Sequence, residues 1–377
     1  MKLRIAVLAS NYIKVPSLPK DVPQGESGAP EKIMSTITEG LVQRGHDVTL
    51  FASGDSQTSA RLVSVTKRAT ALDPKIGKGK HIEFEHLLIS ECYRMAKEGE
   101  FDIIHSIFDT RSAYYTQFTS TPTVSTLHSP LDDFVKQTVL SHFANTQYYI
   151  SISNAQRKPL PQLQYIQTIY HGIDTSAITF NKTIDSDYML FVGRIVPEKG
   201  IETSIKTAET LGKKLYLLGS VDENIPFWTQ EIKPHIDNAF IYHLGYISKE
   251  KVYHFYQNAK LFLFPIQWEE PFGLVMVEAM ACGTPVVTFA RGSVPEVIKD
   301  GETGFIVNPS DEDIRGDWIV KKTGLEGLRE AVEKIYSMPE NDYKQMRRSC
   351  RAHVEKNFTA ERMVNDYEQV YRNILKR

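Results

Sequence analysis

Short apolar runs alternate with amphipathic stretches along the first half of the chain. The stretch 31–44 carries Ile33, Ile37 and Leu41 at i, i+4 and i+8, and Gly45 follows it, which predicts a helix. The apolar runs have the length of buried strands and lie at 4–9, 47–52, 101–105, 123–127 and 148–153. Because strands separated by helical stretches are typical of a parallel sheet covered on both faces, we predict an α/β domain.

The second half of the chain repeats this alternation. Strand-like apolar runs lie at 188–192, 215–218, 240–244, 261–264, 285–289 and 304–307. The polar, turn-rich segment 171–187 separates the halves, so we predict two Rossmann-like domains in series, with ligands bound in a central cleft at the carboxyl ends of their strands. The segment 360–375 places five apolar residues on one face and is predicted as a final helix.

Composition and charge limit the class of protein. The chain is 41% hydrophobic and 24% charged, as in soluble globular proteins, and its net charge of -2 gives no electrostatic reason to expect nucleic acid. Cys92, Cys282 and Cys350 are widely spaced, which fits a reducing compartment rather than a disulfide framework. No apolar run approaches the ~20 residues that span a bilayer, and the run at the start reads as a core strand rather than a signal peptide. We therefore expect a cytoplasmic protein.

One carboxylate interrupts an otherwise apolar helix. Between Phe272 and Ala281 every residue is apolar or Gly except Glu278, so this helix is expected to be buried on all sides. An ionised carboxylate without a partner is costly to bury. Either Glu278 caps a backbone NH or pairs with a basic residue inside the fold, or it accepts hydrogen bonds from the vicinal hydroxyls of a ligand such as a ribose.

The start of this helix adds an anion site and a second carboxylate. It follows the apolar run 261–265, hence the carboxyl end of a strand, and Gly273 leaves room for close backbone approach. The first-turn NH groups and the helix dipole favour an anion there. Glu270 precedes the turn and suits sugar hydroxyls or a cation rather than a phosphate. The segment therefore offers partners for a sugar, a diphosphate and a ribose in that order.

A basic loop follows the first strand of the second half. Its sequence, GRIVPEKG at 193–200, places Arg194 and Lys199 between a strand and a helix that starts near Ile201. Two cations and free NH groups at one spot suit a diphosphate. The alternative is a pair of solvated loop charges, one of them paired with Glu198.

Together these segments resemble a known family. The pairing of GRxxxEKG with an E-x7-E spacing at Glu270 and Glu278, followed by AMACGTPVV, is similar to the retaining glycosyltransferases of family 4, which have the GT-B fold. The resemblance covers nearly the whole chain and is most specific in the C-terminal half. It implies an N-terminal acceptor-side domain over 1–172, a nucleotide-sugar donor domain over 173–357, and a C-terminal helix over 358–377 that packs back on the N-terminal domain.

The resemblance also implies roles for the residues that match the family's motifs. Arg194 and Lys199 would hold the donor diphosphate. Glu270 would contact hydroxyls of the transferred sugar, and Glu278 would bind the ribose. His128 matches a histidine near the reacting centre, although a lone histidine after a strand is also common as a structural residue. The catalytic set is then His128, Arg194, Lys199 and Glu270, and the further donor-binding positions are Gly28, Gly193, Tyr246, Ile247, Phe272, Gly273, Leu274 and Glu278.

One stretch departs from the family's pattern, and another resembles a metal-binding motif only in its residue types. A Gly-Gly turn that many members carry before the first helix is represented here by Ser27 and Gly28, with Pro30 close behind, which alters the expected phosphate contact on that side. Asp185 and Asp187 spell a metal-binding D-x-D but lie in the predicted linker. We expect no metal and no cofactor, because the cations would stabilise the diphosphate.

The predicted reaction moves a hexosyl group from a nucleoside diphosphate sugar to an acceptor hydroxyl with retention of configuration. UDP-glucose is the first expectation for the donor, ahead of UDP-N-acetylhexosamine and GDP-mannose. The acceptor would be a saccharide, a lipid-linked sugar or a small molecule. The basic stretch 61–80 reads as a solvated loop, with peripheral contact to anionic lipid as the alternative.

Three other classes of protein compete with this interpretation. A sugar-nucleotide epimerase would share the fold but needs acid and base groups around the sugar. A non-catalytic nucleotide-sugar binder is disfavoured, because all four charged donor-site residues are present together. A dehydrogenase is disfavoured because no G-x-G-x-x-G follows the first strand.

Overall fold

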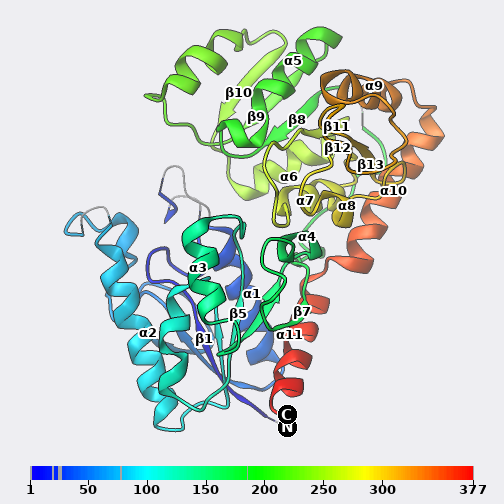
Figure 1. Ribbon diagram of the computed structural model, residues 1–377. Coiled ribbons are helices and arrows are strands. Elements are labelled where there is room, and N and C mark those ends of the chain that lie inside the picture. Colours follow the sequence, from blue (N-terminus) through cyan, green and yellow to red (C-terminus); the bar gives the residue numbers. More distant parts are fainter. Residues whose placement is uncertain (1, 19–20, 24–27, 77–78, 185, 377) are drawn as a thin grey trace. The chain divides into compact units, whose positions relative to one another are not determined.

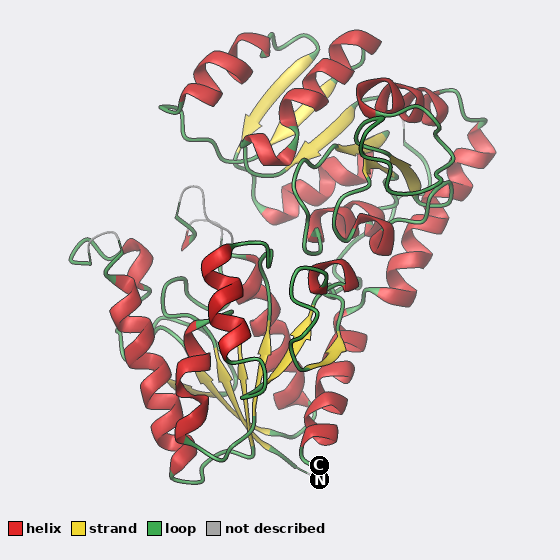
Figure 2. Cartoon of the chain, in the orientation of Figure 1, coloured by secondary structure: helices red, strands yellow, loops and turns green. Residues whose placement is uncertain are grey.

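The computed structural model describes residues 2–376 except 19–20, 24–27, 77–78 and 185 (Figure 1). The chain forms two compact units. Unit 1 comprises Met1–Gly172 and Ala360–Arg377, and unit 2 comprises Ile173–Thr359. Each unit has its own parallel sheet with helices on both faces (Figure 2). The predicted α/β architecture with two Rossmann-like sheets is confirmed.

The sheet of unit 1 has seven parallel strands in the order β3-β2-β1-β4-β5-β6-β7. The strands are β1 (Arg4–Leu8), β2 (Asp47–Phe51), β3 (Arg61–Val63), β4 (Ile103–Ser106), β5 (Thr123–Thr126), β6 (Tyr148–Ser151) and β7 (Tyr165–Thr168). The five strands predicted from apolar runs are all present. The two edge strands, β3 and β7, were not predicted, because each is only partly buried and carries no distinctive apolar run.

The basic stretch 61–80 is therefore not simply a solvated loop. Its first residues form the edge strand β3, which extends the sheet beside β2, and Thr70–Leu72 form a short 3-10 helix, η2. Thr70 is buried, and its NH donates to the carbonyl of Asn11 at 2.9 Å. Backbone pairing with β2 and with the loop after β1 holds the stretch, although its side chains are mostly polar.

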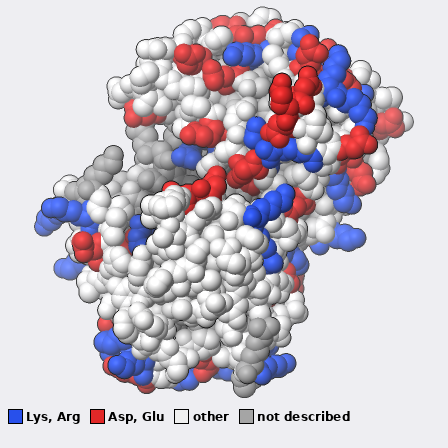
Figure 3. All heavy atoms as spheres, in the orientation of Figure 1, with Lys and Arg blue, Asp and Glu red and all other residues white. Residues whose placement is uncertain are grey.

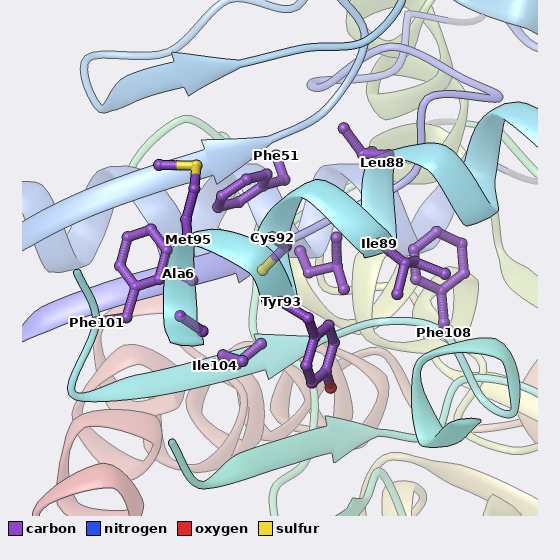
Figure 4. Close-up of a cluster of buried hydrophobic side chains, with 12 residues drawn as sticks. Ala6, Phe51, Leu88, Ile89, Cys92, Tyr93, Met95, Phe101, Ile104 and Phe108 are labelled. Carbon is purple, nitrogen blue, oxygen red and sulfur yellow. The ribbon is translucent and has the colours of Figure 1, made fainter. Parts of the chain in front are cut away.

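The helices of unit 1 cover its sheet from both sides. They are α1 (Ala29–Gln43), α2 (His81–Lys97), α3 (Phe134–His142), α4 (Asn154–Arg157) and α11 (Ala360–Ile374), with the 3-10 helix η3 (Arg111–Phe118). The apolar face of α2 turns Leu88, Cys92 and Met95 toward the sheet (Figure 4). There they pack against strand residues such as Phe51 and Ile104, which gives this unit a continuous apolar core.

The C-terminal helix α11 crosses back onto unit 1, as the fold prediction required. Its apolar face is buried, and Val364 packs so closely on α1 that a Cβ at Gly40 would lie 2.7 Å from it. The Tyr371 hydroxyl lies 2.7 Å from Nδ1 of the buried His105 in β4, and the Tyr367 hydroxyl lies 3.1 Å from Thr126. Burial lowers the pKa of His105 to about 3. These contacts attach α11 to unit 1 through a polar seam inside an apolar interface.

The sheet of unit 2 has six parallel strands in the order β10-β9-β8-β11-β12-β13. The strands are β8 (Met189–Val192), β9 (Leu215–Leu218), β10 (Ile241–Gly245), β11 (Leu261–Phe264), β12 (Val286–Phe289) and β13 (Gly304–Val307). The helices are α5 (Ile201–Leu211), α6 (Lys249–Asn258), α7 (Leu274–Ala281), α8 (Val294–Val297), α9 (Gly324–Tyr336) and α10 (Glu340–Asn357), with shorter turns η4 (Pro197–Lys199), η5 (Phe227–Ile232) and η6 (Lys233–His235).

The strand order of unit 2 reverses between β8 and β11. The chain leaves β8 toward β9 on one side and later returns to β11 on the other, so the loops after these two strands diverge. In open α/β sheets, ligands bind at the carboxyl ends of strands at such a switch point. At the border of the unit, the NH of Ile173 donates to the carbonyl of Phe358 at 2.9 Å, which joins the incoming and outgoing segments.

Candidate functional site

The loops after β8 and β11 meet through close backbone packing. Gly200, at the start of α5, has φ 74°, and a Cβ there would lie 1.9 Å from the carbonyl oxygen of Pro265. The NH of Gln267 donates to the carbonyl of Glu198 at 2.9 Å. Only glycine fits at position 200, both for its left-handed backbone and for this contact. The loop GRIVPEKG is therefore held against the segment that precedes Glu270.

Lys199 and Glu270 form a mostly buried ion pair between these two loops. Lys199 Nζ lies 2.6 Å from Glu270 Oε2, with side-chain exposures of 14% and 10%. Trp268 Nε1 donates to the same oxygen at 2.9 Å, and Lys199 Nζ lies 4.5 Å from the centroid of a Trp268 ring. The alternative of solvated loop charges is wrong for Lys199, because its partner is the buried Glu270 and not Glu198.

The backbone on both sides of Glu270 is fixed by the loop after β12. Ser293 donates its NH to the carbonyl of Glu270 and its hydroxyl to the carbonyl of Phe272, both at 2.9 Å. A Cβ at Gly292 would lie 2.2 Å from the Glu270 carbonyl oxygen. Phe272 is itself buried. Sequence reasoning missed Ser293, because a lone serine before a short helix carries no motif.

Glu269 belongs to a separate ion-pair network. Arg315 Nη1 lies 2.6 Å from Glu269 Oε1 and Arg291 Nη1 lies 3.4 Å from it, while both arginines also contact Asp313. Acidic and basic side chains lie side by side over this unit in the space-filling view (Figure 3). The two adjacent glutamates thus differ, since Glu269 is half-exposed among arginines and Glu270 is buried against one lysine.

Helix α7 begins at Leu274, after Gly273 in a left-handed conformation with φ 79°. A Cβ at Gly273 would lie 2.5 Å from Met276 Cε and 3.3 Å from Glu270 Cγ, so the Glu270 side chain lies against the start of the helix. First-turn NH groups and the helix dipole favour an anion at this position. The helix start and the ion pair therefore belong to one site.

The expectation that this helix is buried on all sides is wrong. Leu274, Val275 and Glu278 are all partly accessible, and they share one face because they are spaced by three and four residues. The other residues of the helix are buried. Glu278 therefore lies on the one accessible stripe of α7, one turn beyond the helix start. Burial, and secondarily the charge of Glu278, raises the pKa of Cys282 to about 12.

The remaining donor-side positions lie at the same edge of the sheet. Gly193 and Arg194 directly follow β8, and Arg194 is partly exposed. Tyr246 and Ile247 directly follow the edge strand β10, which β9 separates from β8, and Tyr246 is 55% exposed. All of these residues are thus at the carboxyl ends of strands, with the Lys199–Glu270 pair nearest the switch point.

In unit 1, His128 lies two residues beyond the end of β5. Its NH donates to Asp109 Oδ1 at 3.0 Å, and its ring stacks on that of His171 with centroids 5.4 Å apart. Nε2 of His128 is buried and has no hydrogen-bond partner among the described residues. Burial lowers the pKa of His128 to about 4, and the nearby Asp109 only partly opposes this. The imidazole is therefore neutral at pH 7. Sequence reasoning missed Asp109, which holds this loop.

Gly28 caps the start of α1. The Ser17 hydroxyl donates to its carbonyl at 2.5 Å, and a Cβ at Gly28 would lie 2.4 Å from that hydroxyl oxygen. The position requires glycine for space rather than for a left-handed backbone, since its φ is -95°. Ser27 and Asp185, on which two of the sequence expectations rest, lie outside the described residues.

The two parallel-sheet units, with a polar cluster at the switch point of the second, define a GT-B architecture. Residues 177–348 match the family model of glycosyl transferases group 1, and residues 31–177 match that of Glycosyltransferase Family 4. The chain belongs to the family 4 type of glycosyltransferases. The resemblance of the sequence motifs to the family 4 type of glycosyltransferases is thereby confirmed.

Relatives and solved structures agree with this family. The chain is 25% identical over 351 residues to a D-inositol 3-phosphate glycosyltransferase of Mycolicibacterium smegmatis, which covers 78% of this chain and 77% of that one. Other matches are shorter: an uncharacterized 41.2 kDa protein in the cps region of Klebsiella pneumoniae is 26% identical over 49% of this chain and 46% of its own length. This chain thus spans about half the length of some of the curated relatives it matches.

Two solved structures share the fold over the full chain. Sucrose-phosphate synthase from Thermosynechococcus elongatus has a TM-score of 0.79 at 21% identity and covers all of both chains. The Anabaena protein HepE, solved in complex with UDP and glucose, has a TM-score of 0.72 at 16% identity, covering 98% of this chain and all of that one. At these identities the likeness concerns the fold. Among the described residues, no helix is both long and apolar enough to cross a bilayer.

Proposed function

We propose that this chain is a retaining glycosyltransferase that moves a hexosyl group from a nucleoside diphosphate sugar, UDP-glucose first, to an acceptor hydroxyl. The observation that carries the proposal is the buried Lys199–Glu270 pair at the switch point, beside the start of α7. A cation, a carboxylate and a helix N-terminus at one edge of a sheet match the phosphates and hydroxyls of a nucleotide sugar.

The leaving diphosphate gains charge as the glycosidic C–O bond breaks. Lys199, Arg194 and the first-turn NH groups of α7 would stabilise that charge from fixed positions. Lys199 gives one hydrogen bond to Glu270, which leaves ammonium donors for phosphate oxygens. Glu270 therefore has a second task besides sugar binding, which is to hold the lysine in place before the donor arrives. Removing one such donor typically costs about 10²- to 10³-fold in rate.

Glu270 and Glu278 would bind hydroxyls on either side of the diphosphate. Glu270 Oε2 is occupied by Lys199 and Trp268, whereas Oε1 has no hydrogen-bond partner among the described residues. That oxygen is available to a hydroxyl of the transferred sugar. Glu278, on the accessible stripe of α7, would accept hydrogen bonds from the two ribose hydroxyls.

His128 would act as a neutral partner of the sugar rather than as a cation. Its pKa of about 4 means that the imidazole is uncharged at pH 7. Its buried Nε2 can donate to or accept from a sugar hydroxyl, depending on the tautomer. The acceptor proton would pass to the departing phosphate oxygen, so no side chain has to become a covalent nucleophile. The residues of this chain can supply charge stabilisation without a metal.

The acceptor side would be formed by loops at the carboxyl ends of β1 and β4. Arg111 Nη1 lies 2.8 Å from Oε2 of the buried Glu85, and the Ser10 hydroxyl donates to Glu85 Oε1 at 3.1 Å. The related proteins named above act on an inositol phosphate or form a sucrose phosphate, and both are small polar molecules. We therefore propose that the acceptor of the present chain is also a small hydroxylated molecule.

The test is a thermal-shift screen of UDP, GDP, ADP and their common sugar conjugates without added metal. A ligand at 100 times its dissociation constant adds about 2.7 kcal/mol, which is a clear shift. We expect one nucleotide to stabilise the wild type and Lys206→Ala, an exposed-lysine control on α5, but not Lys199→Ala or Glu278→Ala. The absence of a shift with every nucleotide would contradict the donor site. NMR of the product anomer, once an acceptor is found, tests retention.

A further inference from the structure

A cavity lies at the opposite edge of the unit 2 sheet from the candidate donor site. It has a volume of about 360 Å³ and sits beside Asp187 and Lys260, which precede β8 and β11. The donor-site loops follow the same two strands, so the strands separate the two places by roughly 13 Å. The cavity walls carry three lysines, two tyrosines and a methionine: Lys182, Lys260, Lys344, Tyr336, Tyr343 and Met338.

Lys260 lines this cavity, and its ammonium group has no polar partner among the described residues. Its Nζ lies 3.6 Å from the centroid of the Tyr343 ring and 5.9 Å from that of the Tyr336 ring. Within the described part of the chain, Nζ makes no hydrogen bond and no ion pair. The ring faces attract the charge but do not replace three N–H hydrogen bonds. Burial, and after it the charge of Arg347, lowers the pKa of Lys260.

The surroundings of Lys260 carry more positive than negative charge. Lys213 Nζ lies 4.3 Å from the Tyr336 ring centroid. Arg347 is fully buried and donates to backbone carbonyls and the Tyr343 hydroxyl rather than to a carboxylate. Of the carboxylates that line the cavity, Glu340 is already paired with Lys344.

The other lining carboxylate, that of Asp187, forms no ion pair with a described residue, although its charge partly opposes the lowering of the Lys260 pKa, and Lys182 is exposed. Among the residues that the structure describes, the cavity lining therefore carries three lysines against two carboxylates.

We propose that this cavity binds a small phosphate ester, with Lys260 as its central contact. Lysine binds phosphate as a point charge, and two or more lysines around one hollow suit a dianion. The tyrosine rings and Met338 offer apolar walls for the carbon skeleton of the ester. The volume is within the range of small-molecule sites. This site is independent of the proposed transferase activity, since it uses none of the donor-site residues.

The test is isothermal titration of the full chain with glucose 6-phosphate, inorganic phosphate and sulfate. It is run in the Lys199→Ala background, so that binding at the candidate donor site does not contribute. We expect glucose 6-phosphate to bind, Lys260→Met to weaken binding by about tenfold or more, and Lys213→Met to weaken it by less than about threefold. Both substitutions remove one cation beside Tyr336, but only Lys260 lines the cavity.

A second measurement does not depend on whether Lys260→Met folds. The rate at which an acylating reagent modifies Lys260 in the unsubstituted chain can be followed by peptide mass spectrometry, with the exposed Lys321 as internal reference. Glucose 6-phosphate should slow modification of Lys260 and leave Lys321 unchanged. Equal protection by inorganic phosphate or sulfate would overturn the assignment to an ester. No protection by any of the three would overturn the site itself.

Discussion

The two units place their candidate reactive groups in opposite electrostatic settings, although both use the carboxyl edge of a parallel sheet. In unit 2, Lys199 forms an ion pair with Glu270 at 2.6 Å. In unit 1, His128 stacks on His171, and burial lowers its pKa to about 4, so it is neutral at pH 7. One fold class can therefore hold a charged pair or an uncharged ring at equivalent edges, depending on which partners the loops supply.

The largest expected effect comes from breaking the charged pair. Lys199→Ala should reduce transfer by about 10²- to 10³-fold, because it removes a fixed cation from the leaving diphosphate. It should also lower the free energy of unfolding by about 2–3 kcal/mol, since Glu270 is left buried with Trp268 alone. Steady-state kinetics and urea unfolding would measure the two losses.

A double variant separates these two losses. Lys199→Met combined with Glu270→Gln removes both charges and should recover most of the stability but none of the activity. Lys206→Ala, which removes an exposed lysine on α5, serves as the control and should change neither. Recovery of activity in the double variant would show that Lys199 has only a structural role.

Because unit 1 buries neutral histidines, we expect acid to destabilise unit 1 before unit 2. His105 and His128 have folded-state pKa values of about 3 and about 4, against an ordinary 6.5. As the pH falls, these histidines take up protons in the unfolded state before they do so in the folded state. Their contribution to the free energy of unfolding is therefore complete above pH 6.5 and declines as the pH falls toward 4. At pH 5 the loss is roughly 2 kcal/mol for each histidine. Hydrogen exchange by mass spectrometry, compared at pH 7 and pH 5, would measure it.

Unit 2 serves as the internal control for the hydrogen-exchange experiment. Peptides that contain β4 and β5 should lose protection before those that contain β8 and β11. His128→Asn should reduce the pH dependence, while His254→Gln, at an exposed position on α6, should not. Earlier loss of protection in unit 2 would contradict the assignment of the acid-sensitive groups to unit 1.

A smaller effect is expected at the ribose contact. Glu278→Gln should weaken nucleotide binding by about tenfold to a hundredfold, because a charged acceptor of two hydroxyls becomes a neutral one. The sharper readout is discrimination against the 2′-deoxynucleotide, which the wild type should show and the variant should lose. Glu302→Gln, at an exposed position in unit 2, is the matched control. If Glu278→Gln discriminates against the 2′-deoxynucleotide as strongly as the wild type does, the assignment of the ribose contact to Glu278 is wrong.

The smallest effect concerns the polar seam under α11. Tyr371→Phe deletes the hydroxyl that lies 2.7 Å from His105 and leaves a buried nitrogen without that partner, which should cost about 1–2 kcal/mol of unfolding free energy. Tyr114→Phe, at an exposed tyrosine of the same unit, should cost less than about 0.5 kcal/mol. Urea unfolding would test both. An equal cost would indicate that the seam adds no stability.

Sequence patterns predicted the architecture well, because buried parallel strands are continuous apolar runs. Edge strands such as β3 escaped the prediction, since a single partner strand leaves their side chains only partly buried. The nearly all-apolar sequence of α7 suggested burial on all sides. Which face of such a helix has no other element packed against it depends on the tertiary structure and not on the residue pattern. Leu274 and Val275 share that accessible stripe with Glu278.

The site was predicted less completely than the fold. Motif spacing identified Lys199 and Glu270 but not their direct pairing, which depends on how two loops 71 positions apart meet. Trp268 and Ser293 escaped because each contributes only one side-chain hydrogen bond, from a position with no motif. Such supporting contacts are set by loop conformation rather than by residue pattern.

The backbone link between Ile173 and Phe358 has a mechanical consequence. The chain passes between the units after Gly172 and after Thr359, and Ile173 also forms a parallel bridge with Thr359. The first and the last residues of unit 2 are therefore held side by side by backbone contacts within that unit. Neither end can fray alone, so loosening one end of the unit should also release the other.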